Sequence, residues 1–122
     1  MRVASVADVQ TPLMTPAGEV IYELVGAAPE TGGVKGHSVA VVVLPPHKSS
    51  GLHYHQVAEE TYYILHGTAR MVIDGQVFPL QPGQACLIEP GERHQIFNDG
   101  DEELAFIAVC APAWTSDDSF FV

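Results

Sequence analysis

Three histidines and one glutamate in this chain have the chemistry and spacing of a metal site. His53 and His55 are separated by one residue, Glu60 follows shortly after them, and His94 lies farther along the chain. Imidazole nitrogens and a carboxylate oxygen suit a divalent transition metal, and four such ligands can leave positions open for water, dioxygen or a substrate. A single histidine is more often a hydrogen-bonded residue than a ligand, and a single glutamate is usually solvated, so the prediction depends on the whole set.

The elements that would position these side chains are short β-strands. Strand-like runs follow one another closely, each ended by a turn signal, and no run keeps a helical apolar period over about ten residues. The runs cover residues 38–44, 60–65, 69–73, 76–80, 85–88, 94–98 and 104–111, with a further candidate at 20–25. Asp74-Gly75 predicts a two-residue hairpin turn, which needs positive φ at both positions. The predicted fold class is all-β, as a sandwich or a small barrel, the jelly roll among them.

Alternation along these strands predicts which side chains share a face. Residues two apart point the same way on a strand, so the imidazoles of His53 and His55 would project together. By the same rule, Glu60 shares a face with Tyr62, and His94 opens another strand with its ring on the Ile96 face. The candidate ligands would therefore come from three separate chain segments.

A longer pattern around the first three ligands resembles the first motif of the cupin family, G-x5-H-x-H-x(3,4)-E-x6-G. The chain matches it from His53 through Glu60 to Gly67. His47 stands where the motif opens with glycine, which leaves open only the turn that enters the strand. Glu59 also satisfies the variable spacing, but only Glu60 leaves six residues before Gly67, so Glu59 is expected to point outward.

The segment around His94 resembles the second cupin motif, G-x5-P-x-G-x2-H-x3-N. It runs from Gly83 to Asn98 with His94 in the histidine position. Glu89 occupies the proline position and Pro90 follows it directly, so the proline is shifted by one residue rather than absent. The turn before His94 is therefore expected to be kept.

The resemblance implies a single-domain double-stranded β-helix, or jelly-roll barrel, over residues 1–122. Residues 34–112 would form the barrel that bears the motifs. Residues 1–33 would form an N-terminal arm with an edge strand, and residues 113–122 a C-terminal tail whose place the sequence does not indicate. A homodimer is also implied, since an edge strand or an N-terminal segment commonly packs on the partner in this family.

The same resemblance implies that His53, His55, Glu60 and His94 hold one divalent metal ion at the centre of the barrel. Manganese or iron is expected first, while nickel, cobalt, copper and zinc also accept such ligands. The function implied is a metal-dependent enzyme of dioxygenase, isomerase or decarboxylase type, acting on a small organic acid, diol or sugar-derived substrate. Because one fold hosts many activities, a non-catalytic module that binds or senses a small ligand is the alternative, and a purely structural metal site is a third.

A few other side chains have expected roles. Tyr62 is the one further catalytic candidate, since its hydroxyl could orient a substrate, with core packing as the alternative. His47 and His66 lie beside turns and are expected to be exposed. Arg93 is expected to point away from the metal, and Arg70 to be solvated on the outer face, with anchoring of a substrate carboxylate as its alternative. The residues expected in the core are Met71, Ile73, Ile88, Ile96, Phe97 and Phe106.

Composition limits the possible partners and the location. Five Lys and Arg against 15 Asp and Glu give a formal net charge of −10, which repels phosphate backbones and anionic lipid, so neither nucleic acid nor a membrane is expected as a partner. The partner expected from the resemblance is a small-molecule ligand or substrate. Cys86 and Cys110 lie inside apolar runs and are expected to be free thiols. The chain shows no phosphate loop and no Cys-x-x-Cys, so no organic cofactor is expected. Without a long apolar segment, a cytoplasmic location is predicted.

Overall fold

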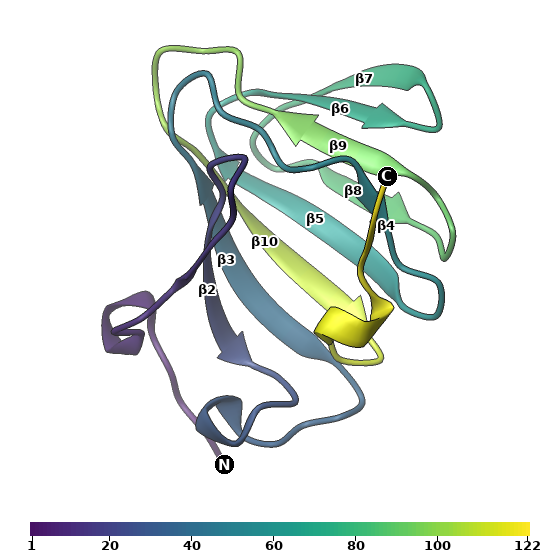
Figure 1. The fold of residues 1–122 in the computed structure, drawn as a ribbon. Helices are drawn as coiled ribbons and strands as arrows, with labels where there is room; N and C mark the ends of the chain where they lie inside the picture. Colours follow the sequence, from purple (N-terminus) through teal and green to yellow (C-terminus); the bar gives the residue numbers. More distant parts are fainter.

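The computed structural model describes residues 1–122 as two antiparallel β-sheets that face each other (Figure 1). The first sheet contains, in spatial order, β1 (Leu13–Met14), β2 (Val20–Val25), β3 (Ser38–Leu44), β10 (Leu104–Ala111), β5 (Glu59–His66) and β8 (Ala85–Ile88). The second contains β11 (Phe120–Phe121), β4 (His53–Tyr54), β9 (His94–Phe97), β6 (Ala69–Ile73) and β7 (Gln76–Leu80). The predicted all-β fold of jelly-roll type is confirmed.

Helical structure is limited to three single 3-10 turns. These are η1 (Val6–Asp8), η2 (Pro29–Thr31) and η3 (Ser116–Asp118). None of them has the length and apolar character that a membrane crossing requires.

The strands lie where the apolar alternation predicts them. β2, β3, β6, β7, β8 and β10 have the predicted bounds, whereas β5 is one residue longer at each end and β9 is one residue shorter. Asp74 and Gly75 join β6 to β7 with φ values of 48° and 80°, as the predicted hairpin turn requires. Short strands between strong turn signals leave little freedom in where each strand begins, which is why the sequence predicts their bounds well.

The core lies between the two sheets and is formed by their inward faces. Its buried members are Val42, Leu44, Tyr62, Ile64, Ala69, Met71, Leu80, Ile88, Ile96, Leu104, Phe106 and Ala108. Four of the predicted core residues belong to this set, and a fifth, Ile73, packs against it while partly buried.

Phe97 is the exception, and its prediction as a core residue is wrong. His94 and Ile96 are buried, so alternation along β9 turns the Phe97 ring to the outer face, where it is half-buried. The Arg70 guanidinium lies over this ring at 4.0 Å from its centroid. Arg70 also donates hydrogen bonds to Asp99, the shorter at 2.7 Å, so it lies on the outer surface as expected.

Two turn positions explain how the chain keeps the motif geometry. His47, at the position where the motif has glycine, adopts a left-handed backbone with φ of 63°, and its ring lies 3.0 Å from an Asp101 oxygen. The turn therefore survives the loss of the glycine. Gly67 keeps the motif residue for a steric reason: a Cβ there would lie 2.8 Å from the Glu103 carbonyl oxygen.

The C-terminal tail, which sequence reasoning leaves without a place, is fixed against the second sheet. Strand β11 pairs with β4, with Phe121 opposite His53. The Trp114 backbone N–H donates to the Ser38 hydroxyl at 2.9 Å, which ties the tail to the first sheet as well. In Figure 1 the tail, in yellow, runs along the end of β10 and up beside β4.

Candidate metal centre

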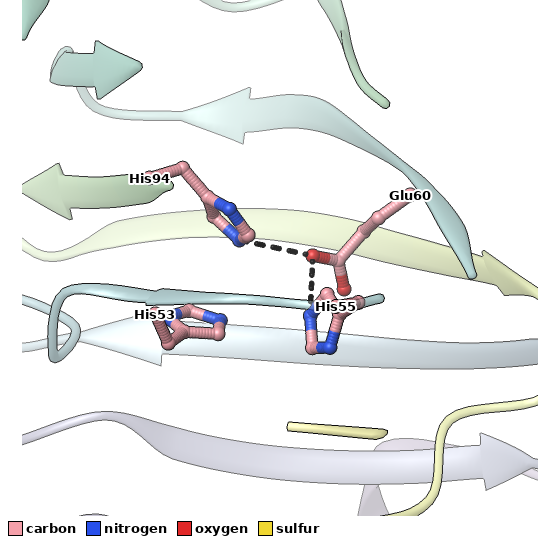
Figure 2. Close-up of side chains that lie close together, drawn as sticks. All are labelled: His53, His55, Glu60 and His94. Atoms are coloured by element: carbon pink, nitrogen blue, oxygen red, sulfur yellow. Dashed lines mark ion pairs between the residues drawn. The ribbon is translucent and has the colours of Figure 1, made fainter. Parts of the chain in front are cut away.

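The four predicted ligand residues converge in the interior of the barrel. His53 lies on β4 and His55 just after it, Glu60 is the second residue of β5, and His94 opens β9. All four are buried, and one possible ligand atom from each lies within 4.8 Å of the others. Figure 2 shows the three rings and the carboxylate directed toward one another. Glu59, the alternative in the motif, is exposed.

Each histidine is oriented by a backbone carbonyl. The Nδ1 atom of His53 lies 2.8 Å from the Gly51 oxygen, and that of His94 lies 3.0 Å from the Glu92 oxygen. The Nδ1 atom of His55 lies 2.9 Å from the oxygen of Asp118. A carbonyl can only accept, so each Nδ1 carries the hydrogen and donates it, which leaves the Nε2 lone pair of every ring free for a metal.

The polar atoms that face inward have no hydrogen-bond partner. His55 Nε2, His94 Nε2 and Glu60 Oε1 are buried without one. They lie close together, since Oε1 is 3.3 Å from the His55 nitrogen and 3.4 Å from that of His94 (Figure 2). Burying such atoms unpaired is costly, whereas a shared cation would satisfy all three. The residues present therefore fit a divalent metal ion.

The second oxygen of the Glu60 carboxylate is held by a thiol. Cys110, on β10, donates from Sγ to Glu60 Oε2 at 2.9 Å, and both side chains are buried. Burial, and then the negative charge of Glu60, raise the pKa of the Cys110 thiol, so that it stays protonated and able to donate. The thiol directs Oε1 toward the histidines. Cys110 and Cys86 are both free, as expected, but no sequence pattern predicts the contact between Cys110 and Glu60.

Electrostatics couple the four residues. Burial, reinforced by the neighbouring His94, lowers the pKa of His53 to about 4, so this ring is neutral at neutral pH. Burial raises the pKa of Glu60, but the adjacent His55 and His94 rings outweigh it and hold that pKa below its usual value. Burial lowers the pKa of His55, but the Glu60 carboxylate outweighs it and raises that pKa. A metal cation beside Glu60 would supply the positive charge that a protonated His55 ring would otherwise provide.

The loop that carries His55 is clamped by the C-terminal tail. The Asp118 carboxylate accepts the backbone N–H groups of Gln56 and Ala58, each at 2.9 Å, and that of Val57 at 3.0 Å. Burial opposes its charge, but these bonds prevail and lower the pKa of Asp118. Since the carbonyl of the same residue orients the His55 ring, Asp118 fixes both this loop and a candidate ligand.

A cavity of about 600 Å³ opens onto the centre between the two sheets. Tyr62 lines it and also belongs to the core, with its ring 4.5 Å from that of Phe106. Burial, and then the charge of Glu60, raise the pKa of Tyr62 well above its usual value, so its hydroxyl stays protonated. The tail residues Trp114 and Phe121 form part of the wall.

Glu19 is a buried acidic residue that lines the cavity but belongs to no motif. It directly precedes β2 and faces the same cavity as the centre. The other side chains considered from the sequence lie outside the cavity lining: His47 and His66 are exposed, as expected, as is Arg93. No lysine or arginine lines the cavity.

Comparisons with known proteins identify the family and agree with the fold. The family model described as "Cupin domain" matches residues 40–110. An oxalate-binding protein of Thermotoga maritima is 40% identical over 75 residues, which span 62% of this chain and 62% of that protein, less than two thirds of its length. An uncharacterized protein of Methanocaldococcus jannaschii is 32% identical over 108 residues, which cover 88% of this chain and 85% of that one.

The fold agrees with a solved structure of the same kind. A predicted oxalate decarboxylase from Thermotoga maritima aligns with a TM-score of 0.76 and 28% identity, over 91% of this chain and 99% of that one. The matched family segment contains all four residues of the centre as well as the thiol that holds the carboxylate. From the motifs, the two-sheet fold and these matches, the chain belongs to the cupin family.

Proposed function

We propose that this chain holds one divalent transition metal ion at His53, His55, Glu60 and His94 and uses it as the centre of a small-molecule enzyme. The observation that carries the proposal is the group of three buried, unpartnered atoms that face one another, His55 Nε2, His94 Nε2 and Glu60 Oε1. Four buried candidate ligands beside an open cavity suit a reactive centre better than a closed structural one, because a substrate can reach it.

The chain's own residues would prepare the site for chemistry. The backbone carbonyls that accept from the Nδ1 atoms keep the rings in one orientation, and Cys110 keeps one carboxylate oxygen aimed inward. The Tyr62 hydroxyl, which lines the cavity, would orient a bound molecule by donating a hydrogen bond. When bound, the ion would supply Lewis-acid chemistry toward an oxygen atom of the ligand.

The metal and the reaction class are the finer parts of the proposal. Manganese or iron is the expected ion, although the ligand set also accepts nickel, cobalt, copper and zinc. The names of the two Thermotoga relatives support a small oxygen-bearing ligand, and a decarboxylase, isomerase or dioxygenase reaction would each suit the open cavity. The oxalate-binding relative also favours the second candidate, a module that binds its ligand without converting it.

Elemental analysis tests the metal centre. Untagged protein, purified without chelators or a nickel column, is measured by inductively coupled plasma mass spectrometry beside the variants His53→Ala and His94→Ala, with His66→Ala as the exposed control. We expect about one ion per chain in the parent and the control, and loss in the two site variants. A parent that takes up no metal even after reconstitution, or a His94→Ala variant that keeps a full complement, would overturn the proposal.

A second experiment separates enzyme from binding module. Iron-loaded protein that consumes oxygen, or manganese-loaded protein that releases product from a panel of small acids, diols and sugars, supports the enzyme. Thermal stabilisation by one of these compounds without turnover supports the module. The homodimer, the cytoplasmic location and the single-domain organisation stay predictions, and analytical ultracentrifugation tests the first of them.

A further inference from the structure

We propose that Glu19 is the second polar anchor of the cavity: it hydrogen-bonds the far end of an uncharged, mainly apolar ligand whose oxygen atoms face the metal centre, and the cavity discriminates against dianions. The ligand class is a phenol, enol or ketone with a further oxygen away from the centre. The inference deepens the proposed function and rests on the metal centre described above.

Glu19 is held in place by a tight turn but its carboxyl group is poorly satisfied. The backbone N–H of Glu19 donates to the Thr15 hydroxyl at 3.1 Å, and the backbone N–H of Thr15 donates to the Glu19 carbonyl at 3.0 Å. The single protein hydrogen bond to the carboxyl group comes from that same hydroxyl and is long, at 3.5 Å. The residue is only 7% exposed, and its Oε2 has no protein partner but is not sealed from solvent, so this oxygen is open to the cavity that Glu19 lines.

Glu23, a second carboxylate of the cavity lining, has the hydrogen-bond partner that Glu19 lacks. Glu23 lines the same cavity, and its Oε1 accepts a hydrogen bond from the Thr31 hydroxyl at 2.8 Å. Glu19 lacks such a partner although it is more buried. An oxygen that is open to the cavity and has no protein partner can hydrogen-bond a ligand oxygen without breaking a contact within the protein.

The charges around the cavity favour a ligand with little negative charge. Its lining contains three carboxyl groups, those of Glu19, Glu23 and Glu60, and no lysine or arginine. A divalent ion with the Glu60 carboxylate leaves one net positive charge at the centre. A neutral ligand or a monoanion is therefore tolerated, whereas a dianion such as oxalate would leave an unpaired negative charge among further carboxyl groups.

The walls of the cavity suit an apolar body. Ile21, Val42 and Ala108 line the cavity from the first sheet, and Trp114 and Phe121 line it from the tail. A ring or short hydrocarbon segment bound in the cavity would contact such side chains and displace water from them.

The protonation of Glu19 agrees with this role. In the metal-free chain burial, and then the negative charge of Glu60, raise the pKa of Glu19 to about 7. Burial is the larger cause and does not depend on a bound ion, and the protonated carboxyl group can donate a hydrogen bond to a ligand oxygen.

Calorimetric titration of the zinc-loaded chain tests the inference, because zinc undergoes no redox change. The probes are 3,4-dihydroxyacetophenone, with a metal-binding diol and a distant ketone, and 4-ethylcatechol, which lacks the ketone. We expect Glu19→Leu to reduce the preference for the ketone by about fivefold, the equivalent of one hydrogen bond. Glu19→Gln, whose amide can donate, should keep most of that preference. Oxalate should bind the parent more weakly than either diol.

The outcomes separate the inference from the metal centre. Zinc content is measured on the same samples, and circular dichroism checks that each variant is folded. A parent that binds no zinc overturns the centre and the inference together. Zinc-loaded parent and Glu19→Leu proteins with the same ketone preference, or a parent that prefers oxalate, overturn the role of Glu19 alone. If Glu19→Leu does not fold, the same ketone preference is measured in Thr15→Val, which removes the hydroxyl that accepts the Glu19 backbone N–H and should therefore reduce the preference; an unchanged preference would then overturn the role of Glu19.

Discussion

Replacing Glu19 by glutamine should change how the stability of the metal-free protein depends on pH. The pKa of this carboxyl group rises from its ordinary value of 4.5 to about 7 in the folded chain, chiefly through burial. Between these two values the folded state holds a proton that the unfolded state has released. The contribution of Glu19 to stability is therefore fully present below pH 4.5 and is lost as the pH rises through about 7. Glutamine does not titrate and escapes this loss.

The magnitude follows from the size of the pKa difference. From 4.5 to about 7 the shift corresponds to about 3 kcal/mol in the free energy of unfolding. Between pH 5.5 and pH 8.5, about 2 kcal/mol of this falls within the measured range. The free energy of unfolding falls by roughly 1.5 kcal/mol per molar urea. The difference between the urea midpoints of variant and parent should therefore increase by more than about 1 M from pH 5.5 to pH 8.5.

Urea unfolding of chelator-treated parent and Glu19→Gln proteins at these two pH values measures the difference directly. Groups that titrate in both proteins cancel in the subtraction, and Glu59→Gln, which removes an exposed carboxylate, provides the baseline. A variant-minus-parent difference that stays constant from pH 5.5 to pH 8.5 would refute the reasoning, because the carboxyl group would then titrate alike in the folded and unfolded chains.

Three further predictions concern the centre and its supports. Cys110→Ala should weaken metal affinity about tenfold, since it removes the donor to Glu60, whereas Cys110→Ser should keep most of the affinity; competition titration with a chromophoric chelator measures both. Asp118→Asn should lower the free energy of unfolding by about 2 kcal/mol, because three backbone N–H groups lose a charged acceptor. Denaturant unfolding tests this against Asp117→Asn, an exposed neighbour, and equal stabilities would contradict it. Gly67→Ala should cost about 2 kcal/mol more than Gly75→Ala in the same assay, since both glycines have positive φ but only Gly67 has backbone within reach of a new Cβ.

The sequence predicts those parts of the structure that depend on local pattern. Alternation and turn residues determine where β3, β6 and β10 begin and end, and motif spacing selects Glu60 over its exposed neighbour Glu59. The wrong placement of Phe97 came from its apolar character alone, although the alternation of β9 already turned it outward.

Contacts between distant segments could not be predicted in this way. The carboxylate of Asp118 reaches the amide of Ala58, sixty positions away, and nothing in either segment signals the pairing. The tail forms only a two-residue strand, too short to show alternation. Glu19 and Cys110 belong to no motif. They reach the cavity only because of the order in which β2 and β10 are placed in the first sheet.

The bond from the His55 ring to the Asp118 carbonyl makes the tail and the metal interdependent. Asp118 lies between Trp114 and Phe121, which form one wall of the cavity. By thermodynamic reciprocity, a bound ion that favours one orientation of this ring strengthens the docking of the tail, and a docked tail strengthens ion binding by the same factor. Metal should then slow hydrogen exchange at the amides of residues 56–58. A movement of the tail that opens this wall to a bulky molecule would also weaken the binding of the ion. The entry of ligand and the release of metal would then depend on the same movement of the tail.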